Sequence, residues 1–214
     1  MASSTSWQTA NGATAPSDTS SFTITAPPET DIWRRSDTDD VFTAPTLYRT
    51  LPSTTFKSLT VTIFAPWKTQ YDQGGLILAF PSPSSTETET KGMKWIKAGI
   101  EYFSNACVLG VVGTDRYSDW SISPMKQEFH QKAKFKVVRE GETVWVYAKQ
   151  EGTEELQAVR EVKWAFMEGR LEGSVWVGVY AAKPKKDEGI GGEEQEGQKG
   201  IEVTFSDLEL ELEE

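Results

Sequence analysis

The sequence predicts an all-β protein, a two-sheet sandwich of jelly-roll type. Apolar and polar residues alternate with period two in about eight or more segments, and no segment shows a strong helical period. Eight tryptophans, ten phenylalanines and six tyrosines are a heavy aromatic load, which favours strands over helices. A chain of 214 residues can form such a sandwich as a single domain.

The elements follow from the same alternation. Residues 1–20 are rich in Ser, Thr and Ala, so we expect a flexible N-terminal arm, followed by one domain at 21–214. Strands are predicted at 21–25, 57–64, 71–80, 95–103, 108–112, 134–138, 144–148, 160–166, 174–181, 201–205 and 208–212; the run 160–166 also fits a helix. The segments 81–92 and 183–200 lack this alternation, and we expect them to be mobile surface insertions.

The strand at 95–103 carries the most informative pattern. One of its faces holds Ile96, Ala98, Ile100 and Tyr102, which is an ordinary core face. The opposite face holds Trp95, Lys97, Gly99, Glu101 and Phe103. Aromatic area with a few polar groups suits the floor of a binding groove, and the alternative is a half-solvated strand with its charges outward.

Charge and cysteine content exclude several classes of function. A net charge of −10 argues against binding to nucleic acid or to an anionic membrane. Cys107 is the single cysteine, so an intramolecular disulfide is impossible.

No apolar run is long enough for a membrane helix and no signal-peptide pattern is present, so we expect a cytoplasmic protein. The acidic turn at 37–40 lacks the glycine of a calcium loop, and we expect neither metal nor cofactor.

Five blocks of the sequence resemble one known family. They are Phe42–Tyr48, Tyr71–Leu76, Trp95–Tyr102, Arg116–Ser121 and Val203–Asp207, and the likeness covers roughly residues 20 to 212. The chain is similar to the DUF1349 family, which includes fungal regulation-of-enolase-like members. The resemblance implies a concanavalin A-like lectin/glucanase sandwich and a contact with a glycolytic enzyme such as enolase. The longer loops at 81–92 and 183–200 depart from the family pattern.

Catalysis on such a sheet would need a second carboxyl group near Glu101. Glycoside hydrolysis uses two carboxyl groups about 5–5.5 Å apart for retention, or about 6.5–9.5 Å apart for inversion. The neighbours of Glu101 on its own face are Gly99 and Phe103, so the same strand supplies no partner. A glycoside hydrolase would therefore have to draw on Asp72 or Asp119.

Binding of a sugar needs only stacking rings and a few polar groups. The candidate ligand-binding residues are Tyr71, Gln73, Trp95, Lys97, Glu101, Arg116, Tyr117 and Asp119. A structural ion pair between Arg116 and Asp119 is the alternative, and Trp120 fits a core position better than a platform. We predict a non-catalytic, lectin-like module that binds a carbohydrate or sugar phosphate and regulates a glycolytic enzyme. The alternatives are a glycoside hydrolase and a protein-interaction scaffold without ligand.

Overall fold

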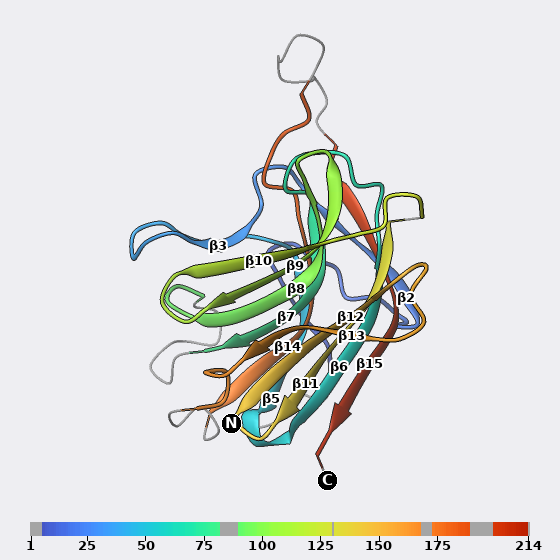
Figure 1. Ribbon diagram of the computed structural model, residues 1–214. Helices are drawn as coiled ribbons and strands as arrows, with labels where there is room; N and C mark the ends of the chain where they lie inside the picture. The colour runs from blue at the N-terminus through green and yellow to red at the C-terminus, as the bar shows by residue number, and fades with distance from the viewer. Residues whose placement is uncertain (1–5, 82–89, 130, 168–172, 189–198, 214) are drawn as a thin grey trace.

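Two antiparallel β-sheets pack face to face in the computed structural model, which describes residues 6–81, 90–129, 131–167, 173–188 and 199–213. Figure 1 shows the two layers, with the segment that carries β3 projecting to one side. This arrangement confirms the predicted all-β sandwich. None of the described segments forms a helix of the length and apolarity that crossing a membrane requires.

Sheet A contains seven strands in the order β1-β5-β14-β7-β8-β9-β10. Their bounds are β1 Gln8–Ala10, β5 Thr46–Pro52, β7 Gln73–Phe80, β8 Lys94–Phe103, β9 Ala106–Thr114, β10 Ser118–Pro124 and β14 Ser174–Ala182. The central strand predicted at 95–103 is β8, and its register places Gln73 on β7 and Val108 on β9 opposite Glu101.

Sheet B contains six strands in the order β13-β12-β11-β6-β15-β2. Their bounds are β2 Ser21–Ala26, β6 Phe56–Phe64, β11 Lys132–Glu140, β12 Thr143–Gln150, β13 Gln157–Val162 and β15 Ile201–Leu212. A short 3-10 turn, Ser53–Thr55, precedes β6. The run predicted as a strand at 160–166 is a strand only to Val162, because the chain then turns to bury Phe166 in the core.

The main core lies between the two sheets. Ile96, Ala98 and Ile100 of β8 point into it, as the period-two pattern predicts. The opposing sheet supplies Val61 and Phe135, both fully buried. Burial of these side chains on both inner faces holds the sandwich together.

A second apolar cluster covers the outer face of sheet A. The hairpin formed by β3 Ile32–Arg34 and β4 Asp40–Phe42 packs on this face, where Ile32 and Phe42 meet Trp95. Arg34 fastens the hairpin, because its guanidinium donates to Met93 O at 2.6 Å and pairs with Asp40 at 2.9 Å. Sequence reasoning predicted an acidic turn here, and did not foresee that the hairpin would cover sheet A.

Two other predictions need correction. The expected flexible arm is in part a strand, because Gln8–Ala10 pairs with β5. The segment predicted as a mobile insertion at 183–200 begins with Lys183, which is fully buried in an ion-pair network. Residues 82–89 and 189–198 of the predicted insertions lie outside the described residues.

Candidate functional site

A buried lysine organises the outer face of sheet A. Lys97 is 3% exposed, and its Nζ donates to Gln73 Oε1 at 2.7 Å and to Ile32 O at 2.6 Å. The same ammonium lies 3.5 Å from Asp31 Oδ1. Three acceptors therefore surround Lys97 already, so its role is to hold the β3 segment and Gln73 in place.

Aromatic rings enclose this ammonium. The ring centroids of Trp33, Trp95 and Tyr180 all lie 5.7–5.8 Å from Lys97 Nζ. The Tyr180 hydroxyl donates to Gln73 Oε1 at 3.2 Å. Burial raises the pKa of Tyr180 well above its ordinary value, and the carboxyl groups of Glu101 and Asp31 raise it further. Both carboxyl groups are thus close enough to Tyr180 to act on it.

Glu101 is the carboxyl group with the most unusual environment on this face. It is 9% exposed, and burial raises its pKa to about 7, an effect to which Asp31 adds. The Lys97 ammonium and, to a smaller extent, the indole N–H of Trp120 lower the pKa in part. The Trp120 indole lies beside the Glu101 carboxyl, but its N–H is not oriented for a hydrogen bond of normal geometry. Glu101 is therefore poised between its neutral and ionised forms near neutral pH.

A glycine makes room for this carboxyl. Gly110 of β9 lies on the same face, and a Cβ at this position would be 3.2 Å from Glu101 Oε2 and 3.6 Å from Trp120 Nε1. Since only hydrogen occupies that place, the carboxyl and the indole N–H converge above Gly110. Gly75, Gly99 and Gly110 are register partners across β7, β8 and β9, so the middle of the face carries no side chains along this row.

Three half-buried aromatic rings form a series beside Glu101. The Phe103 and Trp120 ring centroids are 5.0 Å apart in an edge-to-face arrangement, and Phe103 lies 6.0 Å from Tyr71. Tyr71 holds a positive φ of 71° just before β7. Ile122, 43% exposed, follows Trp120 on the same face of β10. We call Tyr71, Phe103 and Trp120 the aromatic rim, and Ile122 borders it.

The structure brings together four of the predicted ligand-binding residues, Tyr71, Gln73, Lys97 and Glu101. Trp95 shares their face, but it is fully buried beneath the β3–β4 hairpin and offers no exposed ring. Its indole N–H is buried without a hydrogen-bond partner among the described residues. Trp120, predicted as a core residue, is instead half-buried at the rim.

The remaining predicted residues lie apart from Glu101. Arg116 and Tyr117 occupy the exposed turn between β9 and β10, where the guanidinium stacks 5.0 Å from the tyrosine ring. Asp119 alternates with Trp120 on β10, so it points to the opposite face and pairs with Arg160 at 2.6 Å. Asp119 pairs with Arg160, which differs from the Arg116–Asp119 ion pair considered as the alternative.

Neither carboxyl group proposed as a partner for Glu101 is beside it. Asp72 is fully buried and pairs with Lys183 Nζ at 3.2 Å, in a network that Asp187 completes at 2.7 Å. Burial raises the pKa of Asp72, against the opposing effect of Lys183. The carboxyl group that acts on Glu101 is Asp31, whose side chain is 28% exposed. Asp31 precedes Glu101 by seventy positions and belongs to no alternating run, so sequence reasoning had no signal for it.

The described residues contain no cluster of three or more His, Cys, Asp or Glu side chains that could hold a metal ion. Cys107 is buried, and burial together with Asp72 raises its pKa to about 12, which makes the thiol a poor nucleophile.

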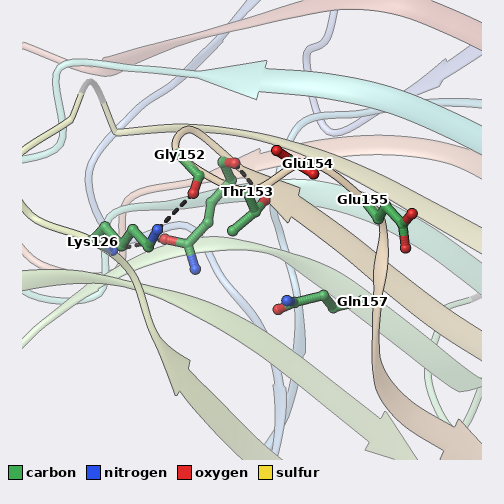
Figure 2. A pocket seen from close by; sticks show the side chains of 7 residues that line it. Lys126, Gly152, Thr153, Glu154, Glu155 and Gln157 are labelled. Carbon is green, nitrogen blue, oxygen red and sulfur yellow. Dashed lines mark hydrogen bonds between the residues drawn. The ribbon is translucent and has the colours of Figure 1, made fainter.

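Glu101 lines neither of two surface hollows that the described residues form. The hollow in Figure 2, about 640 Å³, lies between the segment after β10 and the β12–β13 connection. Lys126 crosses it to donate to Gly152 O at 2.6 Å. Its lining consists of Lys126, Gln150, Gly152, Thr153, Glu154, Glu155 and Gln157. These side chains are polar and offer no aromatic platform.

Comparison with known proteins identifies relatives of this chain. The family model described as "Protein of unknown function (DUF1349)" matches residues 7–212. A protein of Emericella nidulans that carries the name "Uncharacterized protein AN7484" is 39% identical over 192 residues, which are 89% of this chain and 86% of that protein.

Several solved structures share the fold. A functionally unknown protein from Saccharomyces cerevisiae has a TM-score of 0.73 at 20% identity, covering 97% of both chains. LamAcat from Zobellia galactanivorans has a TM-score of 0.52 at 8% identity, over 94% of this chain and 84% of that one. Xyloglucan PUL GH43B from Bacteroides ovatus has a TM-score of 0.54 at 11% identity, over 86% of this chain and 32% of that chain. These likenesses confirm the lectin/glucanase-like sandwich, and at such identities they show the fold alone.

Proposed function

This chain belongs to the DUF1349 family, and we propose that it binds a neutral, hydroxyl-rich saccharide on the outer face of sheet A. The observation that supports this proposal is the Glu101 carboxyl beside the half-buried rings of Phe103 and Trp120. Aromatic rings stack on the apolar faces of sugar rings, and a carboxyl group accepts hydrogen bonds from sugar hydroxyls.

The charges of the site favour a neutral sugar over a sugar phosphate. Lys97 is a cation of this face, and Gln73 Oε1 and Ile32 O already accept its hydrogen bonds. Asp31 and Glu101 would both repel a phosphate group. A neutral saccharide avoids this repulsion and uses the same carboxyl groups as hydroxyl acceptors.

Hydrolysis of a glycosidic bond is the second candidate, because of one specific observation. Asp31 lies within electrostatic range of Glu101, and the pKa of Glu101 is raised to about 7. A general acid must keep its proton near the working pH while a second carboxyl group stays ionised. Glu101 would supply the proton and Asp31 the second carboxyl group.

Titration calorimetry with neutral oligosaccharides selected on a glycan array tests the proposal. Glu101→Gln should weaken binding by about 1.5–3 kcal/mol at a pH where Glu101 is ionised. Asp119→Asn is the matched control, since it removes an exposed carboxylate on the opposite face of sheet A and should leave binding unchanged. Absence of any saccharide binding to the wild type, or equal losses in both variants, would refute the proposal.

The same proteins separate binding from hydrolysis. Release of reducing ends by the wild type, absent in Glu101→Gln and retained in Asp119→Asn, would establish the second candidate. The glycolytic-enzyme partner rests on the family resemblance, and enolase turnover measured with and without the purified protein would test that separate prediction.

A further inference from the structure

The outer face of sheet B carries a hollow with the composition of a sugar-binding subsite. Its volume is about 450 Å³, within the range of small-molecule sites. The ring of Phe64, 40% exposed, is part of its lining. Around this ring stand hydroxyl groups, an ammonium and a carboxylate, from Ser21, Thr62, Lys132, Glu151, Thr204 and Ser206.

A second aromatic surface lies on the same face of sheet B. Trp145 and Tyr147 are two positions apart on β12, and the buried residues Val144, Val146 and Ala148 alternate with them. Their ring centroids are 6.3 Å apart with an interplanar angle of 30°, and both side chains are half-buried. The two rings thus form one stacking platform, which we call the Trp145–Tyr147 platform.

A lysine stripe joins the hollow to this platform. Lys132, Lys134 and Lys136 share the outer face of β11, because the alternating residues Ala133, Phe135 and Val137 are buried in the core. Lys132 is the register partner of Phe64, and Lys136 is the register partner of Tyr147. Successive lysine Cα atoms are therefore roughly 7 Å apart along the strand, and the stripe from the partner of Phe64 to the partner of Tyr147 is roughly 14 Å long.

The stripe remains available to an anionic ligand. Lys134 lies 3.9 Å from Asp207, but the two side chains are 41% and 56% exposed, so the pair contributes little. On the far side of β6, Glu209 and Glu211 of β15 give the face an acidic border. Lys149 of β12, the register partner of Lys134, lies on the same outer face, so the positive charge follows β11 with one further lysine beside it.

We propose that the outer face of sheet B binds an extended anionic polysaccharide along β11. Its sugar rings stack on Phe64 and on the Trp145–Tyr147 platform, and its regularly spaced carboxylate or sulfate groups meet the lysine stripe. The hydroxyl-lined hollow matches sugar hydroxyls, whereas a nucleic acid would place a denser line of charge beside the acidic border of β15.

Calorimetry at low ionic strength with polygalacturonate oligomers tests this site, and fully methyl-esterified oligomers of the same length serve as the uncharged control ligand. The wild type should bind the charged oligomer and not its ester. The triple variant Lys132→Gln, Lys134→Gln, Lys136→Gln should bind it roughly tenfold or more weakly. The triple variant Lys91→Gln, Lys185→Gln, Lys199→Gln removes the same charge from exposed positions elsewhere and should bind as the wild type does.

Two further variants separate this site from the fold and from sheet A. Replacing the three stripe lysines by arginine should preserve binding, and Glu101→Gln should not alter it. The proposal is overturned if the wild type does not bind the charged oligomer, if both glutamine triple variants lose affinity equally, or if the ester binds as tightly. Tighter binding of single-stranded polynucleotide than of polygalacturonate would likewise overturn it.

Discussion

Ionisation of Glu101 should lower the stability of the protein as pH rises. An unperturbed glutamate ionises near pH 4.3, whereas burial raises the pKa of Glu101 in the folded protein to about 7. Between these two pH values the folded state retains a proton that the unfolded state has released. The stability that this group contributes is therefore complete below about pH 4 and is lost as pH rises through 7. The difference between the two pKa values corresponds to a full loss of about 3 kcal/mol. Solvent screening reduces this value little, because the Glu101 side chain is only 9% exposed.

Comparison with Glu101→Gln isolates this contribution, because the amide cannot ionise. Urea unfolding of both proteins should be measured at about pH 5 and about pH 8.5. The free energy of unfolding of the variant, relative to the wild type, should increase by about 3 kcal/mol from the lower to the higher pH. Other titrating groups are shared by the two proteins, so their contributions cancel.

Glu202→Gln provides the matched control, since Glu202 is an exposed glutamate on the outer face of sheet B. Its effect on stability should be the same at both pH values. If the difference between Glu101→Gln and the wild type were also independent of pH, the argument that burial holds a proton on Glu101 would be refuted.

Three further substitutions test the rest of the structure by urea unfolding. Lys97→Met should lower the free energy of unfolding by about 3 kcal/mol, because Gln73 Oε1 and Ile32 O lose a charged donor. An NMR titration should show a further rise in the pKa of Glu101, because the variant lacks the ammonium that lowers it. Lys94→Met on the same strand is the control, and an equal cost in both variants would contradict the role of Lys97. Gly99→Ala should cost about 3 kcal/mol, because its Cβ would overlap Gly74 O on the neighbouring strand; an unchanged midpoint would show that β7 and β8 are not so close. Lys183→Met should cost about 3–5 kcal/mol, because it leaves buried carboxylates unpaired, whereas Lys68→Met, at a 63% exposed partner of the same network, should cost under about 1 kcal/mol.

Local sequence pattern predicted most of the sandwich. Alternation along 95–103 correctly separated a core face from a polar and aromatic face, and β8 shows both. The strands predicted at 134–138 and 144–148 are equally clear as β11 and β12, which Gly141 joins. Five strands were not predicted: β3 and β4 are three residues each, β1 lies in a stretch of small polar residues, and β5 and β10 are longer strands of sheet A.

What the sequence determined by itself is the direction of each side chain on its strand, because period two is a property of the backbone. It placed Lys97 and Glu101 on one face without indicating their neighbours. Only the tertiary structure decided that Asp31 lies close enough to affect the pKa of Glu101, that Asp72 pairs with Lys183, and that Trp95 is covered by a hairpin. Those outcomes depend on strand order, register and chain crossings between distant segments, and no local pattern carries that information.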